Sequence, residues 1–483
     1  MKLKLILSAT LFLLLAASQP ARSQELETGY FLGGNPYAFR LNPAFQSERN
    51  IVSIALGGTG LGFKSNLGVS TLFYPDANGR LYTFMNERVQ AADFMKKIGQ
   101  RNYLDLDSRV NLLTVGFWSW SRFFTIDFNV RSLNSVSLPY DLFSFLKGGT
   151  ETRQSFDMSG MGVRSKEFVE AAFGWSNNYD DVFNLGVRVK ALVGIGEAEI
   201  QARNLRMNLT GERWEIQAQS VLNASSPSLT YSRNGDELDL ESIRFNEGTY
   251  GPAGYGMALD LGASWNVHPC VTLSASLLDL GTIRWNREIQ GVSPAASYTW
   301  NPSEQDDADS WQEEMGDAFE EMTDLFRFQD KSGSGAAFEM MPFRVLLGAE
   351  FRMPFYDRLS VGALYQGRGG ACFAHHSGRI SLNWNPLDFL SLSTGTTVDK
   401  IGESIGFVLN LHPAGINLML GCDYLPFHSV DVSPLLDDET RRNLPPFVSR
   451  LTLLPRDRMN LNLYVGLNLA FGSRRLDHAK RFM

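Results

Sequence analysis

The sequence is poor in the residues that build disulfide frameworks and zinc sites. It has 3 cysteines and 6 histidines among 483 residues. The cysteines are far apart in the chain: Cys270, Cys372 and Cys422. An odd number of distant cysteines disfavours a disulfide scaffold, and the pair His375-His376 has no companion ligands at a recognised metal spacing. We therefore expect no metal and no other cofactor.

Long hydrophobic runs are also scarce, since the one such run lies at the very start of the chain. Lys2 and Lys4 precede an apolar stretch over residues 5–17, and Ala21-Arg22-Ser23 offers a small-x-small cleavage site. This pattern predicts a secretory signal peptide over residues 1–23, because the apolar run is shorter than the roughly 20 residues of a membrane-spanning helix.

Net positive charge is lacking as well. The formal net charge is −8, and loss of residues 1–23 removes three positive and no negative charges, which gives −11. Nucleic-acid binding rewards clustered Lys and Arg, so we expect no nucleic-acid partner.

Glycine and aromatic residues, by contrast, are plentiful, at 44 glycines and 12% Phe, Trp and Tyr. Past residue 50 the dominant pattern is alternation at period two, as in Phe124, Ile126, Phe128 and Val130, which alternate with polar residues. The same pattern recurs at residues 183–191, 257–265, 343–352, 380–384, 416–420 and 461–471. Such alternation indicates β-strands with one apolar and one polar face.

Strand length separates two all-β alternatives. Strands of a soluble sandwich usually have five or six residues, whereas these runs reach about 9 to 11, the length of a tilted strand that crosses a bilayer. The sequence therefore predicts a transmembrane antiparallel β-barrel of about 14 strands, with 12 to 16 as the range. An exported soluble β-protein is the alternative.

Charged residues recur on the polar faces of these strands, as expected for a wet lumen lined by ion pairs. The lumen-facing candidates are Asp127, Arg131, Arg188, Lys190, Arg344, Glu350 and Arg352.

The segment before the first strand has no regular period and is rich in Gly, Pro and Asn. It contains Asn42-Pro43-Ala44-Phe45, and proline forces extended or turn geometry on the residue before it. We expect a plug inside the barrel. The predicted organisation is a signal peptide at 1–23, a plug or hatch at 24–50, a barrel at 51–472 and a basic tail at 473–483.

An Asn42-Pro43-Ala44 element in a short N-terminal hatch, followed by about fourteen strands, resembles the long-chain fatty-acid transporter (FadL-like) family of outer-membrane barrels. The overall plan also resembles barrel proteins of Bacteroidota. The resemblance implies passive uptake of hydrophobic small molecules, with the hatch shifting to open a route.

Two further segments interrupt the alternation. Residues 84–99 show a helical period. Residues 303–330 hold eleven acidic residues and one basic residue, Arg327, and predict an amphipathic acidic helix. Its apolar stripe either folds onto the barrel mouth or docks a ligand or partner, through Trp311, Met315, Phe319, Met322 and Phe326.

No catalytic residue is predicted. The chain has no Gly-x-Ser-x-Gly elbow, and the glycines at 58, 60 and 62 lie in a strand region with no following helix, which excludes a dinucleotide loop. There they let the sheet bend or let the plug approach closely.

We therefore expect a non-enzymatic barrel in the outer membrane of a Gram-negative bacterium, in contact with membrane lipid and the barrel assembly machinery. It either transports hydrophobic or amphipathic small molecules passively or serves as a secretion or surface-assembly accessory that docks an envelope protein partner. A general porin-like protein is a third alternative.

Overall fold

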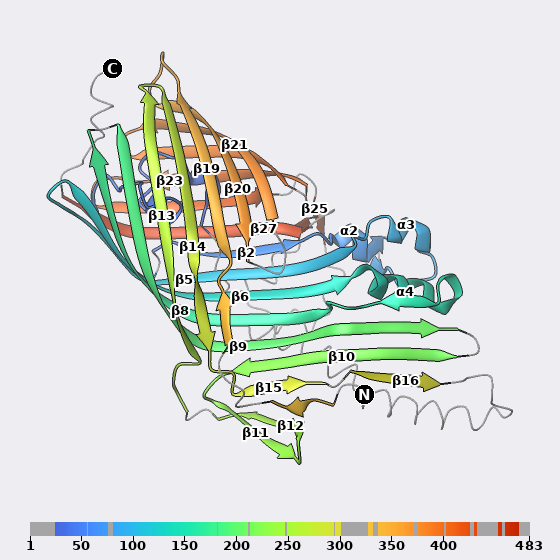
Figure 1. Cartoon of the computed structure of the whole chain (residues 1–483). Coiled ribbons are helices and arrows are strands. Elements are labelled where there is room, and N and C mark those ends of the chain that lie inside the picture. The colour runs from blue at the N-terminus through green and yellow to red at the C-terminus, as the bar shows by residue number, and fades with distance from the viewer. Residues whose placement is uncertain are drawn as a thin grey trace.

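The computed structural model describes residues 25–472 except 56, 76–80, 181, 211–212, 247–248, 294, 301–326, 332–336, 371–374, 400–401, 426–428, 432–452 and 456–458. Antiparallel strands dominate this part of the chain (Figure 1). Among the described residues, no α-helix combines the length and the apolar character needed to cross a membrane.

Fourteen strands close into one antiparallel barrel. Its first strand is split into β1 and β2, because both pair with the last strand, β27, on one side and with β5 on the other. In ring order the wall consists of β1 (Asn50–Ile54) with β2 (Thr59–Ser65), β5 (Arg101–Ser119), β6 (Arg122–Pro139), β8 (Gly162–Tyr179), β9 (Phe183–Leu209), β13 (Gly254–His268), β14 (Val271–Trp285), β19 (Phe343–Arg352), β20 (Leu359–Gly369), β21 (His375–Leu387), β22 (Leu390–Asp399), β23 (Glu403–Leu411), β24 (Ile416–Leu425) and β27 (Met459–Phe471).

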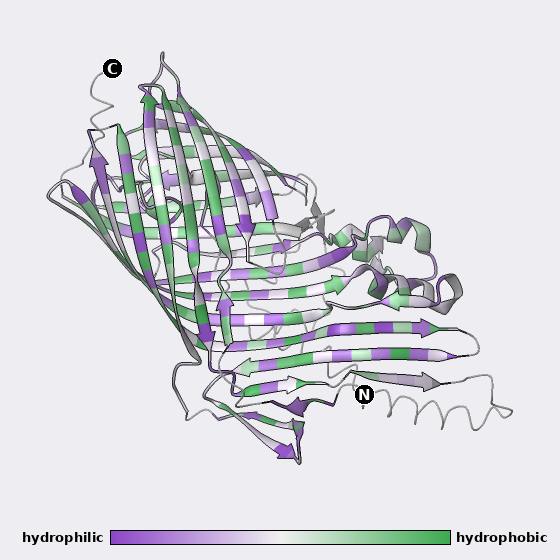
Figure 2. Cartoon of the chain, in the orientation of Figure 1, coloured by the Kyte–Doolittle hydropathy of each residue, from purple (hydrophilic) through white to green (hydrophobic). Residues whose placement is uncertain are grey.

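Hydropathy alternates along the wall strands, as Figure 2 shows. On β9, Val189 is 57% exposed, whereas the neighbouring Arg188 and Lys190 are 2% exposed. Exposed apolar side chains also face outward on β21 and β27, including Ile380 and Leu469. The predicted fold class and the central estimate of fourteen strands are therefore confirmed.

One end of the barrel has short turns and the other has long connections. The turn between β5 and β6 consists of Trp120 and Ser121, both with positive φ (46° and 65°). Positive φ at both central residues is the backbone geometry that matches the twist of paired strands. β9 and β10 (Trp214–Ser225) extend far at the opposite end, beside the helices of the long connections (Figure 1).

The remaining elements belong to the plug segment or to the long connections. They are the 3₁₀ turns η1 (Glu27–Gly29) and η2 (Ala38–Arg40), the helices α2 (Val69–Leu72), α3 (Ala91–Met95) and α4 (Tyr140–Thr152), and the strands β3 (Phe73–Pro75), β4 (Leu81–Thr83), β7 (Ser155–Asp157), β11 (Leu229–Asn234), β12 (Glu237–Phe245), β15 (Ile289–Val292), β16 (Ala296–Trp300), β17 (Gln329–Asp330), β18 (Ala337–Met340), β25 (Ser429–Asp431) and β26 (Leu453–Pro455).

The helical period at residues 84–99 overstates the helix, which covers only Ala91–Met95. Phe84 instead bonds through its backbone N–H to the Leu72 carbonyl and stacks on Phe94 at 4.5 Å between ring centroids. Phe143 of α4 joins the same cluster. The apolar spacing therefore reflects tertiary packing between connections and not one continuous helix face.

Several inward-facing glycines of the wall lie directly under the plug segment. A Cβ atom at Gly262 of β13 would come within 2.7 Å of Pro43 Cδ and 2.8 Å of the Ala44 nitrogen. A Cβ at Gly348 of β19 would lie 2.9 Å from Phe31. At Gly58, which has φ +82°, it would clash with Tyr464 and Arg40. The close-approach role expected for glycine is thus found at Gly58.

We predict that Gly262→Val displaces the plug segment, because real Cβ atoms do not tolerate such contacts and overpacking a filled core costs about 1–3 kcal/mol. Limited proteolysis should cleave within residues 25–49 faster than in the wild type, and the melting temperature should fall. The matched control is Gly378→Val, because no described atom lies within 4 Å of a Cβ at Gly378. Equal protease resistance in the two variants would contradict the prediction.

Candidate functional site

Residues 25–49 fill the lumen of the barrel and form the candidate site; we call them the plug. They have no regular structure beyond the two 3₁₀ turns. Their apolar side chains are nearly all buried, including Leu26, Tyr30, Tyr37 and Leu41, each 2% exposed. Turns within the plug satisfy part of its backbone, and the wall must satisfy the buried polar groups that remain.

Asp423 of β24 holds the early part of the plug. Its carboxylate accepts hydrogen bonds from the backbone N–H groups of Glu27 (3.0 Å) and Thr28 (2.6 Å) and from the Thr28 hydroxyl (2.6 Å). Arg379 of β21 donates to the same carboxylate at 2.8 Å, and Asn462 of β27 donates at 2.9 Å. Three wall strands are therefore linked to the plug through one carboxylate.

Asn42 fixes the later part of the plug. Its side-chain oxygen accepts the Ala44 N–H at 3.0 Å, which closes a turn around Pro43. Its amide nitrogen donates to the carbonyls of Ala263 (3.1 Å) and Ala275 (3.3 Å) on two adjacent strands, β13 and β14. Asn42 is fully buried and so needs these partners.

Ala44 and Phe45 complete the predicted motif. Ala44 is fully buried, and Phe45 is half-buried and meets the Tyr30 ring edge-on at 5.0 Å between centroids. The motif therefore anchors the plug to the wall and to itself.

Arg40 carries the plug's main ion pair. Its guanidinium donates to Asp127 of β6 at 2.9 Å and to the Thr114 hydroxyl at 2.7 Å. Burial alone would lower the pKa of Arg40, but the carboxylates of Asp127 and Glu25 outweigh it and raise the pKa above its usual value. Arg40 is therefore a permanent cation in a closed environment.

Around Arg40 lies a connected network of buried ions, which we call the lumen network. Arg188 bridges Asp127 (2.6 Å) and Asp260 (3.2 Å). The lumen network consists of the carboxylates Glu25, Asp127, Glu170, Asp260 and Asp279 and the cations Arg40, Arg109, Arg131, Arg188, Lys190 and Arg344. Buried charges are tolerated only when paired, which explains why so many meet here.

The structure brings five of the seven lumen candidates into this network and leaves two out. Glu350 and Arg352 lie on β19 near the short-turn end and are half-buried. Sequence reasoning missed Glu170, Arg109 and Asp279 as site residues. Asp279 is a bulge residue with φ +59°, where the β13–β14 register shifts, so its place breaks the alternation rule.

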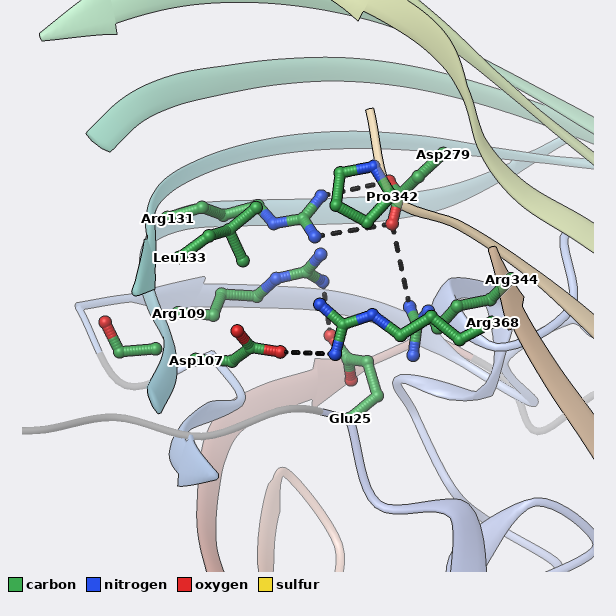
Figure 3. Close-up of a pocket in the computed structure, with 10 residues that line it drawn as sticks. Glu25, Asp107, Arg109, Arg131, Leu133, Asp279, Pro342, Arg344 and Arg368 are labelled. Atoms are coloured by element: carbon green, nitrogen blue, oxygen red, sulfur yellow. Dashed lines mark hydrogen bonds and ion pairs between the residues drawn. The ribbon is translucent and has the colours of Figure 1, made fainter. Parts of the chain in front are cut away.

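A small hollow, open to solvent, lies beside the network toward the long-connection end (Figure 3). Its lining is almost entirely charged or polar, with Leu133 and Pro342 as the apolar members. The other lining residues are Glu25, Asp107, Ser108, Arg109, Arg131, Asp279, Arg344 and Arg368.

Several predicted features lie outside the described residues: the signal peptide, the basic tail and the acidic docking candidates Trp311, Met315, Phe319, Met322 and Phe326. Of the cysteines, Cys270 and Cys422 are free and buried. Within the described part of the chain, no three His, Cys, Asp or Glu side chains are grouped as metal ligands.

The closed ring, its outward apolar side chains and the segment inside it define a plugged fourteen-stranded β-barrel. The chain belongs to the family of unknown function DUF5723, whose model matches residues 43–423. No curated protein matches the chain in sequence.

Several solved structures have a similar fold. They include the toluene transporter TbuX of Ralstonia pickettii (9% identity, 91% of this chain and 94% of that chain, TM-score 0.42) and the toluene transporter TodX of Pseudomonas putida (9%, 93% and 95%, 0.38). A FadL homologue of Pseudomonas aeruginosa is a third (12%, 92% and 95%, 0.38). A FadL homologue, a protein of the family that the sequence resembles, is thus among the similar structures. An origin in Bacteroidota stays a prediction.

We predict that Arg40→Met destabilises the plug strongly, because it leaves the buried Asp127 with one cationic partner fewer. Breaking a buried ion pair from one side costs about 3–5 kcal/mol. Hydrogen exchange of the amides in residues 25–49 should accelerate before the wall strands open.

The control for this prediction is Lys96→Met on α3, which removes the exposed 3.0 Å pair with Asp93. An exposed pair of this kind contributes at most about 1 kcal/mol, so exchange in the plug should not change. If Arg40→Met and Lys96→Met gave the same exchange pattern, Arg40 would not be an anchor of the plug.

Proposed function

We propose that the protein is an outer-membrane barrel of a Gram-negative bacterium that transports hydrophobic and amphipathic small molecules passively, with the plug as its gate. No catalytic residue is part of this proposal, and the neighbours described above are transporters and channels.

The observation that carries the proposal is the two-sided character of the wall beneath the plug. On one side, Leu278 of β14, Leu346 of β19 and Leu364 of β20 face inward on adjacent strands, and Tyr30 and Phe31 of the plug cover them. The lumen network lies mainly on β5, β6, β8, β9 and β13. Displacement of the plug would open a conduit with an apolar wall and an ionic wall, which suits amphipathic molecules.

The plug can shift without opening the wall, because its covalent link to the described wall is at Asn50. Its contacts with the wall are hydrogen bonds, ion pairs and apolar packing, each of which a competing ligand can replace. Plug displacement therefore requires no break in the strand ladders that keep the backbone satisfied in a bilayer.

A second function, a secretion or surface-assembly accessory that docks an envelope partner, is favoured by a different observation. The far half of β9 pairs with β10 along residues 197–209, and β16 pairs with β10 in turn, so a small sheet projects past the barrel (Figure 1). A transport conduit does not require such a platform.

Purification from native outer membrane, followed by mass spectrometry of lipids and proteins, separates the two functions. A co-purifying apolar or amphipathic small molecule without a protein partner would support transport. A stoichiometric protein partner on a ligand-free barrel would support the accessory function and contradict transport.

A lipid-facing location predicts that Val189→Arg lowers the free energy of unfolding in lipid vesicles by about 2–4 kcal/mol if the residue lies near the bilayer midplane. The matched control is Asn208→Arg on the projecting part of the same strand, which is exposed and should change stability little. Equal changes in the free energy of unfolding for the two substitutions would contradict a lipid-facing location for Val189.

A gating plug predicts that Asn42→Ala raises the flux of a fluorescent amphipathic dye into proteoliposomes at unchanged barrel content, because the plug loses the Asn42 hydrogen bonds to β13 and β14. Asn86→Ala is the control, since Asn86 also accepts the N–H two residues later (3.0 Å) but lies outside the barrel. Unchanged flux with a loosened plug would refute gating, whereas loss of folded barrel would assign Asn42 a structural role.

A further inference from the structure

The lumen network contains one more cation than it has carboxylates. Among the described residues, five carboxylates and six cationic side chains are joined by ion pairs. At the hollow, Arg368 pairs with Asp107 at 2.8 Å and is also near the Asp105 carboxylate. A buried guanidinium without a hydrogen-bonded carboxylate is costly, so the most weakly paired cation of the network is a candidate partner for an added anion.

Among the described residues, Arg344 is the one cation of the network without a hydrogen bond to a carboxylate. Asp279 already accepts hydrogen bonds from Arg131 (2.9 Å) and Lys190, whereas Arg344 Nη2 lies 3.9 Å from it, beyond hydrogen-bond distance. Arg344 makes no hydrogen bond with any described residue, although its side chain is only 10% exposed. Figure 3 shows its guanidinium lying within the hollow.

Two further guanidiniums at the hollow have unused N–H donors. Arg109 of β5 uses Nη1 on Glu25, and its Nη2 lies 3.9 Å from Glu170. Arg368 of β20 uses Nη1 on Asp107. Each guanidinium has five N–H donors, so Arg109, Arg344 and Arg368, from three strands, present unused donors around one space (Figure 3).

We propose that this hollow is a binding site for a small hydrophilic anion that carries a phosphate or carboxylate group. Forked guanidinium donors match the oxygens of both groups. The hollow is small and open to solvent, so a compact anion can reach the three guanidiniums.

The site does not depend on passage of any molecule through the barrel. A barrel that fails to transport can still bind an anion, and a transporting barrel can leave the hollow empty. Binding and flux measurements therefore test the two proposals separately.

The test is isothermal titration of the full-length barrel in detergent with inorganic phosphate and, separately, with succinate, at constant ionic strength. We expect saturable binding of at least one of them at one site per barrel. Arg344→Met should weaken it about tenfold or more, because a hydrogen bond to a charged group is lost. The matched control is Arg352→Met, on the same strand and face but away from the hollow, which should bind as the wild type does.

Arg344→Lys keeps the charge but loses the forked donor geometry, so it should show weakened binding and retain a folded barrel if the Met variant does not fold. Heat-modifiable migration on gels reports folding of every variant. Binding of phosphate alone or succinate alone would assign the anion to that class. The proposal would be overturned if neither phosphate nor succinate bound saturably. It would also be overturned if the folded Arg344 variants bound the anion with the same affinity as the wild type.

Discussion

Compensation of charge inside a narrow barrel is the constraint on which the rest of this structure depends. Asp127 is fully buried between two strand neighbours, and a lone carboxylate at such a depth would cost far more than the barrel's stability allows. Arg188 from the wall and Arg40 from the plug neutralise it together. Without the plug, Asp127 loses one of its two cationic partners, so the plug is part of this buried ion-pair network.

The same constraint explains why the plug has so little secondary structure. A helix or hairpin would satisfy its own backbone and have few groups left for the wall. An irregular chain instead presents N–H groups to Asp423 and carbonyls to Ser276, Asn410 and Ser393. Backbone groups of the plug therefore form individual hydrogen bonds with wall side chains, and small wall residues such as Gly262 leave room for its backbone.

Period-two patterning was enough to predict the barrel, its approximate strand number and the inward direction of residues such as Arg188 and Lys190. It could not predict which residues meet, because Asp127, Asp260 and Arg188 come from three strands whose registers depend on non-local pairing. Glu170 was missed because the two consecutive small apolar residues Ala171 and Ala172 interrupt the apolar–polar alternation on β8. Asp279 was missed because a bulge turns it against the pattern. The helical spacing at 84–99 was misleading, because side chains from separate connections share one apolar cluster.

The split first strand has a consequence for the order in which the molecule is built. Asn50 pairs with Phe471 and Thr59 with Val465, so the seam joins the beginning of the wall to its end. The plug directly precedes this seam and contacts β13 and β14, which lie far around the ring. During synthesis the plug therefore exists long before the strand that completes the ring. Its hydrogen bonds to β13 and β14 can form only when these strands are in the sheet, so the segment made first takes its final place late.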